Sequence, residues 1–272
     1  MSSEAGYVHG YTPEEQQRLV AQSLYLEPWV FERVAFDASR RLLEVGCGVG
    51  AQLKILSRRF PHLHLTGVDR SPTQVEAARV VLADEIRAGK VDLGLADGGS
   101  MAFPPGSFDA AFVCWVLEHA PRPRTLLEGL RRVLAPNAVV FATEVFNASL
   151  FLRPVCPAVT EFWAKLNARQ LELGGDPFVG VRLGNLFREA GYSSVETWPV
   201  VFHLDSRWRD AGRRGAFFAY WRQLFHSAVP GLVAAGMATP DLGQRLDEDF
   251  ARLAADPDAI FYVSAFQALA RS

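Results

Sequence analysis

The sequence contains few cysteines and no excess of charge of either sign. Its 272 residues include three cysteines, Cys47, Cys114 and Cys156, which lie far apart in the chain. A disulfide framework or a zinc site is not expected from so few and so widely spaced residues, no other metal site is visible, and a reducing, cytoplasmic setting is favoured. Lys and Arg together number 28 against 30 for Asp and Glu, a formal net charge of -2. Without a basic excess to neutralise phosphates, nucleic acid is not expected as a partner.

Long hydrophobic runs are also missing. The N-terminus, MSSEAGYVHGYTPEEQQ, has no basic segment followed by an apolar stretch, which argues against a signal peptide. The longest apolar run, residues 110–117, is too short to span a bilayer, so no membrane association is expected. Hydrophobic residues make up 49% and charged residues 21%, which is the composition of a globular protein. A single domain over 1–272, acting as a monomer or homodimer, is therefore expected.

Short apolar runs alternate with helical patterns over the first half of the chain. Strands are expected at 40–46, 64–69, 91–97, from the start of 108–119, and at 138–146. Helices are expected at 12–34, where Thr12 is the N-cap and Pro28 a probable breaker, and at 50–60, 71–86 and 122–136. This alternation predicts an α/β fold with a doubly wound, mainly parallel sheet.

The pattern changes after residue 147. An aromatic-rich insertion covers 148–180 and is expected to be helical around 157–173. A helix at 181–192, a strand at 193–205, two helices within 207–256 and a last strand at 259–271 follow. We therefore expect seven strands and an inserted helical cap over 148–180 after the fifth strand. The N-terminal helical segment over 1–39 is expected to be a lid only through the family resemblance given below.

The first expected strand ends in the stretch RLLEVGCGVG, residues 41–50. Three glycines on alternate positions let backbone N–H groups approach a ligand closely. The dinucleotide-binding pattern is G-x-G-x-x-G, whereas the spacing here is G-x-G-x-G. Glu44, two residues before the first glycine, would repel a pyrophosphate and would suit a cationic ligand or an amine.

LLEVGCGVG resembles motif I of the class I S-adenosylmethionine-dependent methyltransferases. Four further stretches resemble later motifs of that family in the same order: LTGVDRS, LADGGSMAFPPGSFDAAF, CWVLEHAPRP and LRRVLAPNAVVFATE. The resemblance covers residues 40–147 clearly and 181–203 loosely. It implies a Rossmann-like core, S-adenosylmethionine as cofactor, and methyl transfer to a small molecule.

The resemblance also implies which residues bind the cofactor. Asp69, at the end of the second strand, corresponds to the acid that holds the ribose hydroxyls, and Asp97 to the acid that meets the adenine amine. The residues expected to contact the cofactor are Tyr11, Gln22, Glu44, Gly46, Cys47, Gly48, Gly50, Asp69, Arg70, Gln74, Asp97, Gly98, Trp115 and His119.

Two residues at the carboxyl edge of the sheet are candidates for catalysis. His119 follows the fourth strand and could act as a base or a substrate contact, while Glu144 could bind a substrate amine. Asn and Gln at helical spacing in the insertion suggest a polar-lined pocket, and Arg182 could pair with a substrate carboxylate. The residues expected to contact the substrate are Tyr7, His9, Tyr11, Trp115, Glu144, Asn147, Trp163, Asn167, Gln170, Phe178 and Arg182.

The expected reaction is methylation of a nitrogen or oxygen of a compact polar metabolite. One alternative is an NAD(P)-dependent oxidoreductase, against which Glu44 and the glycine spacing argue. A nucleic-acid methyltransferase usually carries a (D/N)PP(Y/F) segment after the fourth strand, where this chain has CWVL. A third alternative is a non-catalytic partner that has kept the fold, against which the intact glycine motif argues.

Overall fold

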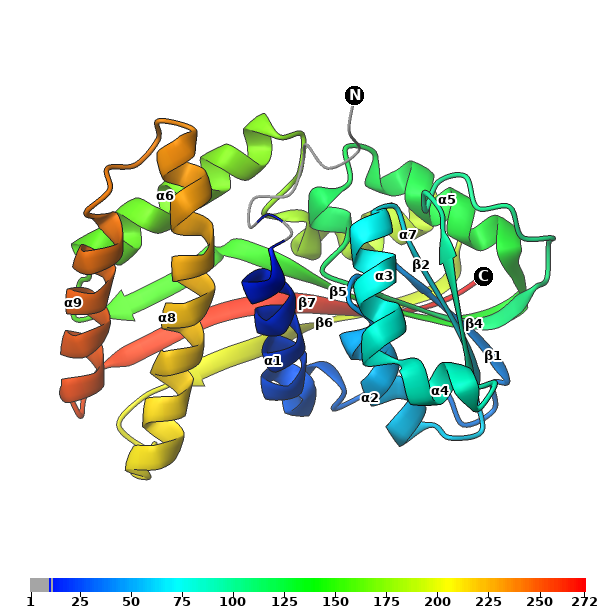
Figure 1. The fold of residues 1–272 in the computed structure, drawn as a ribbon, viewed down its shortest axis with the longest axis horizontal. Helices are drawn as coiled ribbons and strands as arrows, with labels where there is room; N and C mark the ends of the chain where they lie inside the picture. Colours follow the sequence, from blue (N-terminus) through cyan, green and yellow to red (C-terminus); the bar gives the residue numbers. More distant parts are fainter. Residues whose placement is uncertain (1–9, 11) are drawn as a thin grey trace.

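The computed structural model describes residues 10 and 12–272, and in these the strands form a seven-stranded sheet with helices on both faces (Figure 1). The strand order is β3-β2-β1-β4-β5-β7-β6, with β7 antiparallel to both of its neighbours and the pairs among β1 to β5 parallel. The strands are β1 (Arg41–Val45), β2 (His64–Asp69), β3 (Val91–Leu95), β4 (Phe108–Cys114), β5 (Leu134–Arg153), β6 (Ser193–Leu204) and β7 (Ile260–Arg271). The predicted fold class, a doubly wound and mainly parallel sheet, is confirmed.

Alternating side chains of the central strands form two apolar clusters, one on each face of the sheet. Leu42 and Phe112 point to the face covered by α1, α2 and the cap helices, whereas Leu43 and Val113 point to the face covered by α5 and α7. The helices are α1 (Pro13–Val30), α2 (Ala51–Arg59), α3 (Pro72–Val81), α4 (Ala83–Arg87), α5 (Pro123–Val133), α6 (Pro157–Glu172), α7 (Leu183–Glu189), α8 (Ala211–Ala234) and α9 (Leu242–Ala255), with short 3-10 turns η1 (Leu117–His119) and η2 (Val179–Arg182). None of the helices in this part of the chain is both long and apolar enough to cross a bilayer.

Several predicted boundaries are wrong. The helix expected at 71–86 is divided at Leu82 into α3 and α4, and α1 ends at Val30 rather than at residue 34. The largest error concerns β5, which continues to Arg153 instead of ending at residue 146. Its outer part pairs with β7, with Phe151 opposite Tyr262, after a register shift. Residues 148–153 of the expected helical insertion therefore belong to the sheet.

The outer ends of β5, β6 and β7 extend beyond the parallel strands and carry α6, α8 and α9, which occupy the left side of Figure 1. Aromatic contacts bind these helices together and to the sheet: the Phe162 and Phe225 rings stack at 4.6 Å, and Phe217 meets Phe261 edge-on at 5.2 Å. The cap is therefore larger than the segment 148–180, because α8 and α9 complete it.

Candidate functional site

The loop between β1 and α2 has a conformation that its glycines make possible. Gly46, Gly48 and Gly50 all have positive φ, at +72°, +50° and +77°. A Cβ on Gly46 would lie 2.5 Å from a methyl group of Val116, whereas a Cβ on Gly48 would meet nothing within 4 Å. At Gly46 the loop is thus packed tightly against the segment that follows β4. At Gly48 it is open, and a ligand could approach the backbone there.

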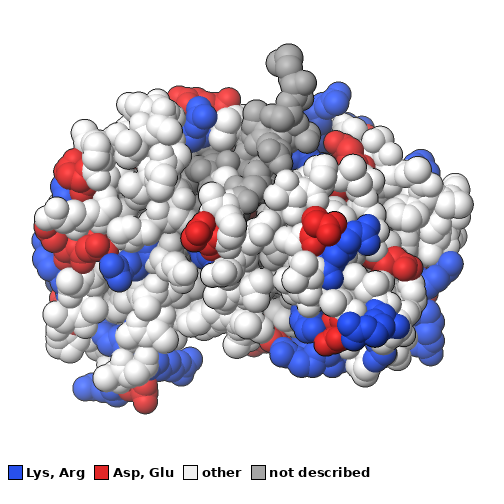
Figure 2. Space-filling model, in the orientation of Figure 1, with Lys and Arg blue, Asp and Glu red and all other residues white. Residues whose placement is uncertain are grey.

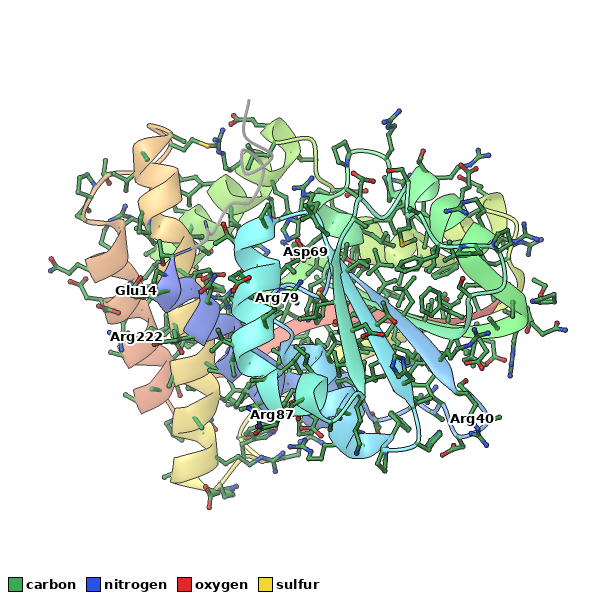
Figure 3. All side chains as sticks on the ribbon, turned by 45° about the vertical axis from the view of Figure 1, so that its right-hand side comes forward. Glu14, Arg40, Asp69, Arg79, Arg87 and Arg222 are labelled. Carbon is green, nitrogen blue, oxygen red and sulfur yellow. The ribbon has the colours of Figure 1, made fainter. Side chains whose placement is uncertain are left out.

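Two acids flank this loop at the carboxyl edge of the sheet. Asp69 ends β2, beside the start of α3 (Figure 3), and its two oxygens accept the N–H groups of Gly48 and Ser71, each at 2.9 Å. Asp97 follows β3, the neighbouring strand, and accepts the Gly99 N–H at 2.8 Å. Asp69 therefore anchors the glycine loop as well as facing the site, a second role that the sequence did not indicate.

Glu44 is buried at the end of β1, with only 2% of its surface exposed. Its Oε2 atom has no hydrogen-bond partner among the described residues. Burial, together with the nearby Asp69 charge, raises the pKa of this carboxyl well above its usual range. A ligand ammonium would supply both the missing partner and the compensating charge, as expected from its position before the glycines.

A cavity of about 500 Å³ joins the glycine loop and both acids to the cap. Fifteen of the sequence-predicted residues line it: Gln22, Glu44, Gly46, Cys47, Gly48, Asp69, Arg70, Gln74, Asp97, Gly98, Trp115, His119, Asn147, Trp163 and Gln170. Five others do not line it: Gly50, Glu144, Asn167, Phe178 and Arg182. Tyr7, His9 and Tyr11 lie outside the described residues. The cavity has the size of a small-ligand site.

The expectation that Glu144 contacts substrate is wrong, because its side chain is fully buried beneath the loop that follows β4. Its carboxylate accepts the backbone N–H groups of Val116, Leu117 and Glu118 at 3.0, 2.8 and 3.2 Å. Burial and the neighbouring Glu118 charge raise the pKa of Glu144 to about 8. Glu144 therefore fixes the loop that carries His119, rather than binding a substrate amine.

The polar contacts expected from Asn167 and Arg182 are also wrong. The Arg182 side chain is 56% exposed and pairs with Asp176 at 2.8 Å, so its charge is directed away from the cavity. Asn167 accepts a hydrogen bond from the Asn147 amide at 2.8 Å and can act on the site only through Asn147. Phe178 and Gly50 likewise support neighbouring segments, Gly50 as the residue preceding α2.

His119 lines the cavity on the turn after β4, as expected. Its Nε2 atom lies 3.7 Å from Oε1 of Glu118. Glu118 Oε2 in turn accepts a hydrogen bond from the Gln170 amide at 2.8 Å, which ties the cap helix α6 to this turn. The imidazole is thus held next to a carboxylate, an arrangement that suits a base in proton transfer.

Sequence reasoning predicted Gln22 of α1 but missed Arg18 of the same helix and the whole contribution of α8. Tyr220, Trp221, Leu224 and Phe225 of α8 line the cavity, as does Arg18 of α1. The spacing of the four α8 residues places them on one face of a helix, a signal that was present in the sequence. Nothing in the sequence showed that this helix lines the same cavity as the glycine loop, some 170 residues earlier in the chain.

Unpartnered polar atoms concentrate in this cavity. Six buried side-chain nitrogen or oxygen atoms lack a hydrogen-bond partner among the described residues. Four of them belong to residues that line the cavity: Glu44 Oε2, Gln52 Oε1, Trp115 Nε1 and Trp221 Nε1. Because buried polar groups are normally paired, this concentration marks a place where a ligand supplies the missing partners.

A glycine loop at the end of the first strand, with acids after the next two strands of a doubly wound sheet, defines a site for a nucleoside-containing cofactor. The family described as "Methyltransferase domain" matches residues 43–142. The O-methyltransferase rstn1 of Aspergillus nomiae is 31% identical over 156 residues, which cover 56% of this chain and 67% of that protein. The trans-aconitate 2-methyltransferase of Methylobacterium radiotolerans is 29% identical over 181 residues, which cover 63% of this chain and 64% of that protein.

A solved structure of Haemonchus contortus phosphoethanolamine N-methyltransferase 2 in complex with S-adenosyl-L-methionine has the same fold, with a TM-score of 0.56 at 16% identity. The match covers 92% of this chain and 52% of that one. The chain belongs to the class I S-adenosylmethionine-dependent methyltransferases. It is an enzyme, and its cofactor is S-adenosylmethionine.

Proposed function

We propose that this enzyme methylates an oxygen or nitrogen of a small molecule, with oxygen as the preferred atom, inside the cavity that the cofactor shares. The observation that carries the proposal is the continuity of this cavity. Its lining includes the glycine loop with Asp69, the imidazole of His119, and the aromatic side chains of α8. Cofactor, base and acceptor can therefore meet in one enclosed space.

The residues present fit the cofactor. The orphaned carboxylate oxygen of Glu44 suits the ammonium of the methionine part, and the open backbone at Gly48 leaves room beside it. Asp69 is placed to accept the ribose hydroxyls and Asp97 to accept the adenine amine, as the resemblance implies. Bound here, the cofactor would supply a methyl group attached to a sulfonium. When the methyl group is transferred, the sulfur is left as a neutral thioether.

The protein's own contribution is position and proton removal. Holding an acceptor in line with the methyl group can lower the barrier by about 7–11 kcal/mol through proximity and orientation. A hydroxyl must also lose its proton as it attacks, and His119, held beside Glu118, is the residue we assign to accept that proton. Glu144 fixes the turn that carries His119 and is a positioning residue.

The preference for oxygen rests on the position of His119 beside Glu118 and on the printed name of a similar protein. An imidazole base is most useful to an acceptor whose nucleophilic atom carries a removable proton, as a hydroxyl does. The relative from Aspergillus nomiae is named an O-methyltransferase. On the face shown in Figure 2, Lys and Arg are interspersed with Asp and Glu rather than gathered in a tract, which supports a small molecule over nucleic acid.

The alternatives are weaker on the same observations. A buried carboxylate beside the glycine loop would repel the pyrophosphate of an NAD(P) cofactor. A non-catalytic relative would have no need for an imidazole held beside a carboxylate within the same cavity.

We retain a single domain with an N-terminal lid and a cap, the cap now including α8 and α9.

Replacing His119 by alanine tests the assignment. We expect kcat to fall by about 10²- to 10⁴-fold while the dissociation constant of S-adenosylmethionine changes little, because general-base catalysis is typically worth that much. Methyl transfer would be followed with methyl-labelled cofactor and a panel of hydroxylated and amino small molecules. His64→Ala is the matched control, since His64 is exposed on β2 and does not line the cavity. Equal activity in His119→Ala and His64→Ala would contradict the assignment.

A further inference from the structure

The part of the cavity formed by the cap is lined by what we call the aromatic wall: Trp163, Phe202, Tyr220, Trp221 and Phe225. The rings form a continuous series. Trp163 lies 5.2 Å from Phe225, and Trp221 lies 6.3 Å from Phe225, 5.2 Å from Tyr220 and 5.8 Å from Phe202, between ring centroids. They come from α6, β6 and α8, and Trp163 and Tyr220 are partly exposed, while Phe202, Trp221 and Phe225 are buried in the same aromatic cluster.

Apolar side chains extend this wall. Leu166, Leu224 and Val263 line the cavity with it, beside the polar side chains of Asn147 and Ser264. Burial raises the pKa of the Tyr220 phenol, so the phenol stays neutral. Apolar walls of this kind bind by excluding water from flat or branched hydrocarbon surface.

The cationic residues of the cavity are poorly placed to hold an anionic acceptor. Arg18 is buried, but its guanidinium is paired twice with Glu15, at 2.6 and 2.7 Å. Arg70 and Arg122 are exposed. A molecule with several carboxylates would therefore lose its hydration without gaining buried, unengaged cations among the described residues that line the cavity.

Among the described residues that line the cavity, the buried donors without a hydrogen-bond partner are neutral. They are two indole N–H groups, from Trp115 after β4 and Trp221 in the aromatic wall. Trp115 is also held in the left-handed region, with φ of +59°, a conformation that costs energy for a residue other than glycine. An indole N–H suits a neutral oxygen such as a hydroxyl, ether or carbonyl, and offers no charge to a carboxylate.

From these observations we infer that the methyl acceptor is a neutral, ring-containing molecule whose apolar body lies against the aromatic wall and which carries oxygen atoms for the indole donors. The inference rests on the proposed function and replaces the compact polar metabolite expected from the sequence. That expectation relied on Asn167, Gln170 and Arg182; only Gln170 lines the cavity, and its amide donates hydrogen bonds to Glu118.

The test measures binding without turnover, on the full-length protein saturated with S-adenosylhomocysteine. Two probes are compared by calorimetry: 2-naphthol, a neutral fused ring with one hydroxyl, and trans-aconitate, a compact tricarboxylate. We expect 2-naphthol to bind at least tenfold more tightly than trans-aconitate. Tighter binding of trans-aconitate, or no binding of 2-naphthol at millimolar concentration, would overturn the inference.

Substitutions at Leu224 locate the bound ring. Leu224 is only partly buried on α8 and lines the cavity, so both Leu224→Ala and Leu224→Lys are expected to fold. The alanine variant should bind 2-naphthol about three- to tenfold more weakly, because it loses apolar contact, and the lysine variant at least tenfold more weakly. Affinity for S-adenosylhomocysteine should stay within about threefold in both, which also checks that they are folded.

The matched control is Leu24→Lys, at a residue of α1 that is 54% exposed and does not line the cavity. It should bind 2-naphthol as the natural protein does. Equal effects at Leu24 and Leu224 would place the probe elsewhere and contradict the inference. If 2-naphthol binds as expected but no hydroxylated or amino compound is ever methylated, the proposed function fails while the apolar ring site stands.

Discussion

At the scale of single residues, the site depends on carboxylates whose positions near the sheet edge look similar but whose surroundings differ. Asp69 faces the cavity and holds two backbone N–H groups, whereas Glu144 holds three and faces no cavity. Sequence position predicted the first role and failed for the second. Both residues follow the expected pattern of a polar side chain at a strand end, and only the side-chain direction separates them.

Replacing Asp69 by alanine should weaken binding of S-adenosylmethionine by at least tenfold. The carboxylate is expected to accept ribose hydroxyls, in charge-assisted bonds of roughly 1.5–3 kcal/mol each. It also anchors Gly48, so the glycine loop loses support at the same time. Calorimetry with S-adenosylmethionine measures the effect, with Asp92→Ala as control because Asp92 is exposed on β3. An unchanged dissociation constant would move the ribose contact to another residue.

Glu144 should make stability depend on pH. Its folded-state pKa is raised from 4.5 to about 8, so folding favours the protonated carboxyl. Its contribution to the free energy of unfolding is therefore fully present below pH 4.5 and is lost as the pH rises through about 8, with a slope of up to about 1.4 kcal/mol per pH unit.

Glu144→Gln should reduce the slope by the contribution of Glu144, since glutamine cannot ionise, and leave the contribution of Glu44, whose pKa is also raised. The substitution should cost roughly 0.5–1.5 kcal/mol at low pH for one lost backbone hydrogen bond. Urea unfolding at several pH values between 5 and 9 would measure both effects. The exposed Glu196→Gln on β6 serves as control and should keep the slope of the natural protein. The same slope in Glu144→Gln would show that another group produces it.

At the scale of elements, the parallel core was predictable and the cap was not. The alternation of strands and helices can be predicted from the local pattern of apolar residues. This signal is strong where a strand is buried on both faces, as β1 and β4 are. The extension of β5 to Arg153 depends on pairing with β7, whose partner residues lie more than a hundred positions away in the sequence. The placement of α8 at the same cavity as the glycine loop is equally non-local, so the aromatic wall was missed although its residues were visible.

Deleting residues 1–22 should leave a folded protein with reduced methyl transfer. The apolar anchors of α1 toward the core, Leu26 and Val30, lie beyond the deletion. The deletion removes Arg18 and Gln22 from the cavity lining, together with the contact from Gln16 to Gln74 of α3 at 3.2 Å. Water would then reach the reacting atoms. A thermal melt and a transfer assay with methyl-labelled cofactor would measure the two outcomes, and full activity would show that this segment does not close the site.

At the scale of the whole molecule, one cavity lies between the core, where we propose that the cofactor binds, and the cap, where we propose that the acceptor binds. The acids and glycines of the core directly follow their strands in the sequence. Fifteen of the residues that were expected to contact cofactor or substrate line the cavity. The other side of the cavity is assembled from α1, α6, β6 and α8, which are distant in sequence. This division explains why the reaction class could be read from the residues while the character of the acceptor needed the fold.

The central claim is that these two halves bind different partners, and a crystal structure with S-adenosylhomocysteine and 2-naphthol tests it most directly. We predict that the ribose lies against Asp69, the adenine near Asp97 and the ammonium at Glu44. The naphthol ring should then lie against Trp163 and Tyr220 of the aromatic wall, with its hydroxyl facing His119. Density for the adenine against the aromatic wall, or for the naphthol outside this cavity, would contradict the account.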